Sequence, residues 1–338
     1  MKFLFNSRLA LIVLALFAVS FTSCDDDDDE ILGIDITNDG TLFLSSNTSG
    51  MVGVIDANDT PFELETFPAV GMDADGIFYD RSSGDLFQIN RSDNNVVVYK
   101  DVIDDLDDPN GIDVRFTSTS DFSNGRGLTR INDNQFVVAQ DGGDDLSNAL
   151  VLYNYSRTNG FSRQRTINTD FNLWGIRSVD NELLAIVDNS DSLAVLSNDI
   201  FNGTDNSIAD VMRYMRIDGI TRTHGLIYDD EDDIMIFTDV ADGGNDSDGA
   251  IIVVRNWTSV RNNATLTASD YTRIAGSNTT LGNPVDVAYD NDEDLIYVAE
   301  RANEGGKLLV FDVDATGNVA PMMSVPFAGV SSLFLNRD

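Results

Sequence analysis

Short apolar runs separated by polar turns dominate the chain after residue 30. Runs such as 96–99, 234–237 and 308–311 contain four apolar residues in succession and lie between clusters of Gly, Asp and Asn. No stretch keeps a 3.6-residue apolar period over three helical turns. Runs this short, bounded by turn-forming residues, are typical of β-strands. The pattern predicts an all-β protein with little helix.

The runs recur in a fixed order. A unit begins with Gly-apolar-x-Tyr-Asp or a variant of it, passes through an acidic turn into an apolar run, and ends with a Gly/Asp/Asn loop and a second apolar run. Units begin at residues 76, 127, 175, 225 and 285, so successive starts are 51, 48, 50 and 60 residues apart. An earlier copy fits at 34–36. Six units therefore fill the chain from residue 31 onward.

A repeat of about 50 residues with four short strands is characteristic of a β-propeller, in which each blade buries its faces against its neighbours. We expect six blades of four antiparallel strands, with seven blades as the alternative. The fourth strands are expected in the weaker runs 62–67, 114–119, 212–217 and 321–327. A further run at 330–335 matches the innermost strand of a unit. We expect it to pair with the strands at 41–67 and close the ring, because an open ring would expose sheet edges.

The N-terminus is expected to be a targeting segment. Lys2 and Arg8 flank the start of an apolar run at 9–21, which is too short to span a bilayer comfortably and has the form of a signal peptide. The Phe-Thr-Ser-Cys sequence that ends at Cys24 resembles the lipobox of bacterial lipoproteins. This resemblance implies that Cys24 is lipidated and becomes the new N-terminus. An uncleaved anchor is the alternative.

An acidic run follows Cys24 at once. Residues 25–30 are five Asp and one Glu, which resembles the signal that exports lipoproteins of Bacteroidota to the outer face of the outer membrane. A solvated acidic spacer is the alternative interpretation. We therefore expect a lipoprotein signal peptide at 1–23, an acidic tether at 24–30 and a β-propeller domain at 31–338.

Charge and residue counts exclude several classes of function. The chain carries 57 acidic and 21 basic side chains, a formal net charge of −36. Nucleic acids and anionic membrane surfaces need Lys and Arg to displace their counterions, so we expect neither as a partner. A single Cys excludes an intrachain disulfide and a Cys-cluster zinc site. A single His, His224, excludes every mechanism that needs two.

One segment resembles a known family of propellers. Residues 283–290, Asn-Pro-Val-Asp-Val-Ala-Tyr-Asp, are similar to the Pro-x-Gly-Ile-Ala-Val-Asp opening of NHL-type blades. Over residues 31–338 the frame resembles the group formed by NHL repeats, YncE-like propellers and six-bladed lactonases of the SMP-30/gluconolactonase type. The resemblance implies that residues just before the innermost strands line one mouth of the central channel. Here they are Asp75, Arg126, Trp174, His224 and Asn283, with Asp286 one step inside.

Two interpretations of these mouth residues stay open. Their groups suit a polar ligand, with Arg126 attracting an anion in a strongly negative chain and Trp174 stacking on the ligand. Alternatively, the side chains fill a narrow channel and bond to each other. His224 has the pKa range of a general base, but no evident nucleophile accompanies it.

Two places are candidates for Ca²⁺. The lactonases that the chain resembles hold a divalent cation with Glu, Asn and Asp, and Asp75, Asn283 and Asp286 offer such oxygen ligands here. The Glu-Gly-Pro-type ligand segment of those lactonases has no match in this chain. Asp-rich loops at 141–145 and 242–249 also offer oxygens, although the second has Gly244 at the first ligand position and no closing Glu. Solvated hairpin turns are the alternative.

The predicted export and lipidation signals, together with the lack of a complete catalytic set, lead to one expectation of function. We expect a non-enzymatic binding propeller, anchored by lipid in the outer membrane and exposed at the cell surface. Its ligand would be a polymer, a peptide or an envelope protein, and Ca²⁺ is the one cofactor considered. The alternative hypothesis is a divalent-metal-dependent lactonase or related hydrolase of the gluconolactonase type that uses the channel mouth.

Overall fold

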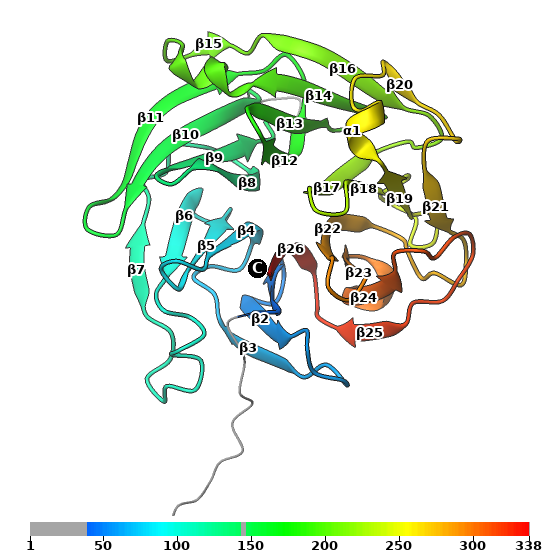
Figure 1. Cartoon of the computed structure of the whole chain (residues 1–338). Coiled ribbons are helices and arrows are strands. Elements are labelled where there is room, and N and C mark those ends of the chain that lie inside the picture. Colours follow the sequence, from blue (N-terminus) through cyan, green and yellow to red (C-terminus); the bar gives the residue numbers. More distant parts are fainter. Residues whose placement is uncertain (1–38, 143–146, 338) are drawn as a thin grey trace, which may run out of the picture. The chain divides into compact units, whose positions relative to one another are not determined.

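Six β-sheets stand around a central axis in the computed structural model, which describes residues 39–142 and 147–337 (Figure 1). The prediction of a six-bladed β-propeller is confirmed, and the alternative of seven blades is wrong. Helix is scarce among the described residues, as expected. It is limited to α1 (Trp257–Val260) and to the 3-10 helices η1 (Asn198–Asn202) and η2 (Asn303–Gly305).

The first three blades follow the chain, and their strands are given from the innermost outward. Blade 1 contains β26 (Val330–Asn336), β1 (Thr41–Ser46), β2 (Met51–Asp56) and β3 (Leu64–Pro68). Blade 2 contains β4 (Ala74–Asp80), β5 (Asp85–Asn90), β6 (Asn95–Tyr99) and β7 (Val114–Thr117). Blade 3 contains β8 (Gly125–Asn132), β9 (Gln135–Gln140), β10 (Ala149–Ser156), β11 (Gly160–Asn168) and a short parallel edge strand, β15 (Ser207–Ile208).

The other three blades complete the ring. Blade 4 contains β12 (Leu173–Val179), β13 (Glu182–Val187), β14 (Ser192–Ser197), β16 (Val211–Ile217) and the parallel edge strand β20 (Thr265–Leu266). Blade 5 contains β17 (Thr223–Asp229), β18 (Ile234–Asp239), β19 (Ala250–Arg255) and β21 (Thr272–Ala275). Blade 6 contains β22 (Pro284–Asp290), β23 (Leu295–Glu300), β24 (Lys307–Asp312) and β25 (Met323–Pro326). The predicted fourth strands are found as β3, β7, β16 and β25.

The apolar runs form the middle strands of the blades and are buried on both faces. Val96, Val97 and Val98 of β6 are all fully buried. Between blades 2 and 3, Phe87 stacks on Phe136 with ring centroids 4.6 Å apart. A strand packed on both faces needs apolar residues at successive positions rather than in alternation. This packing explains the unbroken runs in the sequence.

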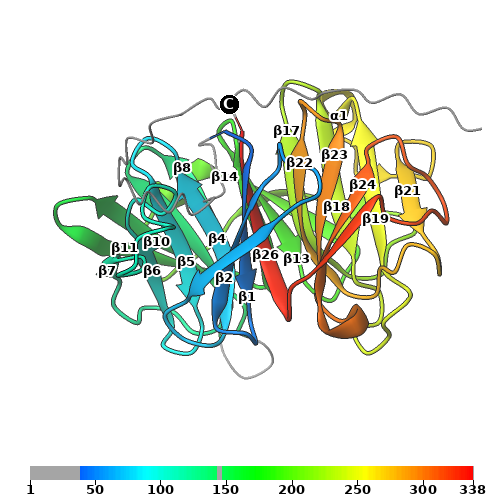
Figure 2. The ribbon, with the colours of Figure 1, turned by 90° about the horizontal axis from the view of Figure 1, so that it is seen from below.

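The C-terminal strand closes the ring. β26 is the innermost strand of blade 1 and pairs antiparallel with β1 (Figure 2). Just beyond it, Arg337 binds Asp290 of blade 6 through Nε and Oδ1 (2.9 Å) and through Nη2 and Oδ2 (2.6 Å). The predicted latch at 330–335 is therefore confirmed. The inner strand predicted at 34–36 lies outside the described residues, and β26 takes the innermost place in blade 1.

Most innermost strands carry the same bulge. In blades 2 to 5 two residues stand between successive paired positions, and the second of them is always glycine: Gly76, Gly127, Gly175 and Gly225. A Cβ on Gly127 would lie 2.8 Å from the carbonyl oxygen of Trp174 in the next blade, which is closer than a side chain tolerates. The glycines let the inner strands approach each other, while the bulges re-aim the residue that precedes each glycine.

Candidate binding site at the channel mouth

A cavity of about 390 Å³ lies at the end of the channel where the innermost strands begin. The five residues predicted at this mouth all line it: Asp75, Arg126, Trp174, His224 and Asn283. Three arginines that the sequence analysis missed line it too: Arg91, Arg222 and Arg301. We call this cavity the arginine mouth, after Arg91, Arg126, Arg222 and Arg301.

A signal for two of the missed arginines is present in the repeat. Arg91 and Arg301 directly follow the second strands of their blades, β5 and β23. The residues in the same place in the other blades are Asn47, Asp141, Asp188 and Val240. Aligning the six units at the ends of their second strands would have shown this position. It forms a second ring of side chains around the mouth.

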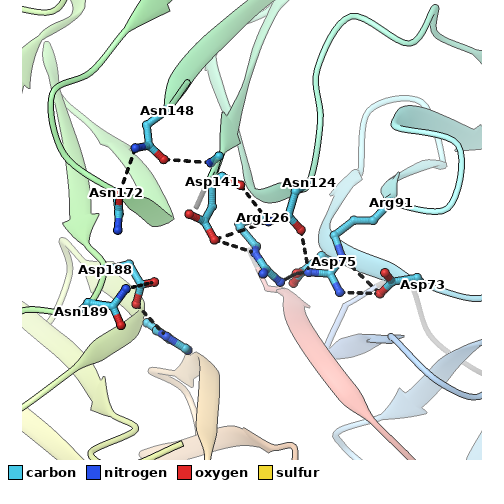
Figure 3. Close-up of polar contacts among 12 residues, drawn as sticks. Asp73, Asp75, Arg91, Asn124, Arg126, Asp141, Asn148, Asn172, Asp188 and Asn189 are labelled. Atoms are coloured by element: carbon cyan, nitrogen blue, oxygen red, sulfur yellow. Dashed lines mark hydrogen bonds and ion pairs between the residues drawn. The ribbon is translucent and has the colours of Figure 1, made fainter. Parts of the chain in front are cut away.

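Asp75 lies between two guanidinium groups. Its Oδ2 is 3.4 Å from Nη1 of Arg91 and 3.3 Å from Nη1 of Arg126 (Figure 3). Asp73 accepts two hydrogen bonds from Arg91, and Oδ2 of Asp141 is 3.5 Å from Nε of Arg126. Burial raises the pKa of Asp75, and the positive charge of Arg91 opposes that rise. These carboxylates fix where the two guanidinium groups point.

Trp174 is held between its neighbours in the ring. The guanidinium carbon of Arg126 lies 3.9 Å from the centre of the indole, and the imidazole of His224 stacks on it at 3.6 Å with 6° between the planes. Arg126 comes from β8 and His224 from β17, the inner strands on either side of β12, so they cover opposite faces of the indole. The observed contacts are those of the second interpretation, in which mouth side chains bond to each other. They leave the indole no open face on which a ligand could stack.

His224 is a buried, neutral imidazole. The residue is 2% exposed, and burial lowers its pKa to about 4. Nε2 lies 3.1 Å from Oδ1 of Asp188, which also accepts from Nε of Arg222 at 2.7 Å. Although burial of Asp188 acts in the other direction, these hydrogen bonds from His224 and Arg222 hold its pKa at about 2. A neutral ring that donates from Nε2 carries its lone pair on Nδ1, and that buried atom has no partner among the described residues.

Catalysis by His224 would need a second group beside it. In the described part of the chain no hydroxyl or thiol forms a hydrogen bond with the ring. A general base activates a nucleophile only within hydrogen-bond reach. The arrangement therefore orients an imidazole and two arginines, and it holds no assembled nucleophile.

Asn283 lies one position earlier than the sequence analysis placed it. It precedes β22, so its counterparts are Asp73, Asn124, Asn172 and Arg222 and not the bulged residues of the other blades. The bulge of blade 6 instead lies between Pro284 and Asp286, which pair with Glu300 and Ala299 of β23, so Val285 is the extra residue. Asn283 was misplaced in the sequence analysis because its position is defined by the strand register within the blade, and this register cannot be read from the sequence of blade 6 alone.

Asp286 occupies the position that glycine holds in the four preceding blades. Its Oδ2 accepts hydrogen bonds from Oγ of Ser332 (2.6 Å) and from the backbone N–H of Leu333 (2.9 Å), both on β26. Its Oδ1 accepts from the backbone N–H of Val287 at 2.9 Å. Where the other blades bring two backbones together, blade 6 joins the closing strand through this carboxylate.

The candidate calcium ligands have other partners in the structure. Asp75 faces two guanidinium groups, and the carboxylate of Asp286 accepts three hydrogen bonds from the protein. Over residues 39–142 and 147–337, no three His, Cys, Asp or Glu side chains are grouped so that they could hold a metal ion. The set of Asp75, Asn283 and Asp286 therefore stays a prediction for which the geometry offers little support.

One of the two Asp-rich loops lies wholly among the described residues. Of the loop at 141–145, residues 143–145 lie outside the described residues. In the loop at 242–249, Asp242 accepts from the backbone N–H of Gly244, and Asn245 accepts from that of Ser247. Such local hydrogen bonds are those of Asx-turns in an exposed hairpin.

The arginines of this chain are nearly all paired. Among the described residues, those with no carboxylate oxygen within 4.0 Å of a guanidinium nitrogen are Arg165, Arg177 and Arg301. Arg165 donates to the carbonyl of Gly203 on the outer side of blade 3. Arg301 lines the arginine mouth, where the amide oxygen of Asn47 accepts from its Nε (2.7 Å) and Nη2 (3.3 Å). Of the four arginines at the mouth, Arg301 is thus the one without a carboxylate partner among the described residues.

Comparison with known proteins supports the fold. No protein-family model matches the chain, and no curated protein matches it. A chain of a nidogen/laminin complex aligns with a TM-score of 0.60 at 10% identity, over 88% of this chain and 98% of that one. A putative 6-phosphogluconolactonase from Bacteroides fragilis aligns with a TM-score of 0.54 at 12% identity, over 85% and 82%. Identities this low show a shared propeller fold alone.

The predicted N-terminal features lie outside the described residues. These are the signal peptide at 1–23, Cys24 and the acidic tether that follows it. In the part of the chain that the structure describes, no helix is long and apolar enough to cross a membrane.

Proposed function

We propose that this chain is a non-enzymatic binding propeller whose arginine mouth captures a ligand through an anionic group, above all a carboxylate. The observation that carries this proposal is Arg301. It is an exposed residue that lines the mouth, and no carboxylate of the described chain lies within 4.0 Å of it, although the protein has 57 acidic side chains. Asn47 accepts from its Nε and Nη2, and the remaining N–H donors of the planar guanidinium are suited to a carboxylate.

The neighbouring arginines support a binding role. Arg222 and Arg126 line the same cavity, and they are oriented by Asp188 and Asp141, which do not line it. Such backing preorganises donors, so a ligand loses less free energy in ordering them. His224 adds no assembled nucleophile, which favours capture over turnover.

The location and partners of the protein are part of the proposal. The lipobox-like sequence that ends at Cys24 and the acidic run after it favour a lipid-anchored propeller on the outer membrane, exposed at the cell surface. A polymer, a peptide or an envelope protein with accessible carboxylates would then meet the mouth. The NHL- and YncE-like resemblance of the repeat is part of the proposal as well.

Titration calorimetry with citrate, a tricarboxylate probe, tests the proposal. We expect citrate to bind and its neutral triethyl ester not to bind. Arg301→Gln should weaken binding by about 1–3 kcal/mol, roughly 5- to 150-fold, because one charged fork is lost. Arg165→Gln removes an equally unpaired arginine far from the mouth and should change nothing. Equal citrate affinity in Arg301→Gln and in the unaltered protein would sink the proposal.

A metal-dependent lactonase stays as the second proposal. The structural neighbour from Bacteroides fragilis, described as a putative 6-phosphogluconolactonase, motivates an assay but shows the fold alone. Lactone hydrolysis that needs Ca²⁺ and disappears in Asp75→Asn would promote this alternative over the binding proposal. The pairing of Asp75 with two arginines disfavours it, because a cation there would meet two positive charges.

A further inference from the structure

A second cavity of about 490 Å³ occupies the rest of the channel. Asp75, Arg126, Trp174 and His224 line both cavities, so they lie between them. The second cavity extends to the opposite ends of the innermost strands, where it is lined by residues such as Asp229 and Arg337. Most of its lining residues do not belong to the arginine mouth.

Arg177 of β12 is the exceptional residue of this cavity. Its guanidinium forms no hydrogen bond to any described residue, and no carboxylate of residues 39–142 or 147–337 lies within 4.0 Å of it. Burial lowers its pKa, and the charges of Asp286, Asp229 and Asp230 oppose that effect. The carboxylate of Asp286, first among these charges, is already occupied by Ser332, Leu333 and Val287. An unpaired charge in a half-buried site is energetically costly. This guanidinium would therefore be stabilised by an anionic partner that the described chain does not supply.

The same cavity holds uncompensated negative charge. Asp229, Asp230 and Glu231 line it, and none of them pairs with a Lys or Arg of the described chain. The polar partners of these carboxylates are neutral: Asp229 accepts from the backbone of Asp232, and Glu231 accepts from the Asn291 amide. Asp230 and Glu231 are exposed, which makes this end accessible from outside.

A cavity that holds a positive and a negative group too far apart to pair is complementary to a ligand that carries both charges. Arg177 and the carboxylates of Asp229, Asp230 and Glu231 are too far apart to pair, yet they line one space. We infer that this second cavity binds a small dipolar molecule, with a carboxylate on Arg177 and an ammonium group on Asp229, Asp230 and Glu231. An anion alone would be repelled by the acidic end, and a cation alone would leave Arg177 unpaired. The inference does not depend on the arginine mouth.

The test uses ω-amino carboxylates of increasing length as probes: glycine, 4-aminobutyrate and 6-aminohexanoate. Hexanoate and hexylammonium are the matched half-probes, since each carries one of the two charges. Calorimetry should find one member of the series that binds the full-length protein at least about tenfold more tightly than either half-probe. If no member exceeds hexanoate and hexylammonium, the inference is wrong.

Three variants locate the binding. Arg177→Gln and Asp229→Asn should each reduce the affinity of the best probe about tenfold or more, to the level of a half-probe. Arg301→Gln, in the other cavity, should leave it unchanged. Loss of binding in Arg301→Gln with retention in Arg177→Gln would overturn the inference and assign the probe to the arginine mouth.

A stability measurement separates a ligand-binding arginine from a structural one. Because Arg177 has no partner in the protein, Arg177→Gln should keep or raise the thermal midpoint of unfolding. Arg337→Gln, which breaks a paired arginine lining the same cavity, should lower it. A midpoint lowered as much by Arg177→Gln as by Arg337→Gln would mean that Arg177 serves the fold, and the inference would fail.

Discussion

Acid should destabilise this propeller through its one histidine. In the folded protein burial lowers the pKa of His224 to about 4, whereas an unfolded chain has a histidine pKa of about 6.5. As the pH falls below about 6.5, the unfolded state takes up a proton that the folded state does not bind. The stabilisation is therefore complete above this pH and is lost progressively as the pH falls towards 4.

The size of the effect follows from the two pKa values. Each unit of difference corresponds to about 1.36 kcal/mol, so the full loss is about 3 kcal/mol and the loss at pH 4.5 is about 2.5 kcal/mol. Losses of this size are a large share of the stability of a typical domain. Asp75, whose pKa is raised, acts in the opposite direction, so the histidine must be isolated by a variant.

The contribution of His224 is isolated by urea unfolding of the unaltered protein and of His224→Gln, measured from pH 7.5 to pH 4.5. Glutamine keeps a donor for Asp188 but does not titrate, and all other groups are common to both proteins. Between pH 7.5 and pH 4.5 the unfolding free energy of the unaltered protein should fall by about 2.5 kcal/mol more than that of His224→Gln. Because the chain has one histidine, its imidazole gives a single NMR signal that reports the folded pKa directly. A folded pKa near 6.5, or a free-energy difference that does not change with pH, would refute the reasoning.

Three further outcomes are expected. Cys24→Ala should move the protein from the membrane fraction to the soluble or unprocessed pool, and unchanged fractionation would contradict the lipoprotein prediction. Deleting 330–338 should lower the thermal midpoint of the whole ring in calorimetry, because β1 loses β26, its partner on the channel side, and Asp290 loses its arginine, whereas an unaffected midpoint would mean that closure contributes little. Gly127→Ala should destabilise the protein by about 2 kcal/mol or more in urea unfolding, since its Cβ would meet the Trp174 carbonyl, whereas Gly244→Ala, whose Cβ would meet only the Asp242 carboxylate at 3.4 Å, should cost less.

The sequence by itself determined the architecture. Unbroken apolar runs in six copies indicate strands that are packed on both faces. This pattern can be read from residues that are neighbours in the sequence. The run at 330–335 could be recognised as an additional inner strand because it matches the innermost strand of the repeated unit. The glycine near the start of the inner strands of blades 2 to 5 was also visible, and it marks where one backbone must approach another.

The tertiary structure decided which further side chains complete the site. Arg91, Arg222 and Arg301 come from the ends of different strands in three blades, and only the ring brings them to one mouth. The shift of Asn283 and the closing role of Asp286 follow from strand register and a bulge, which contacts between strands set and local periodicity does not. Local pattern reports which residues share a strand, whereas the channel is lined by residues that several different strands contribute.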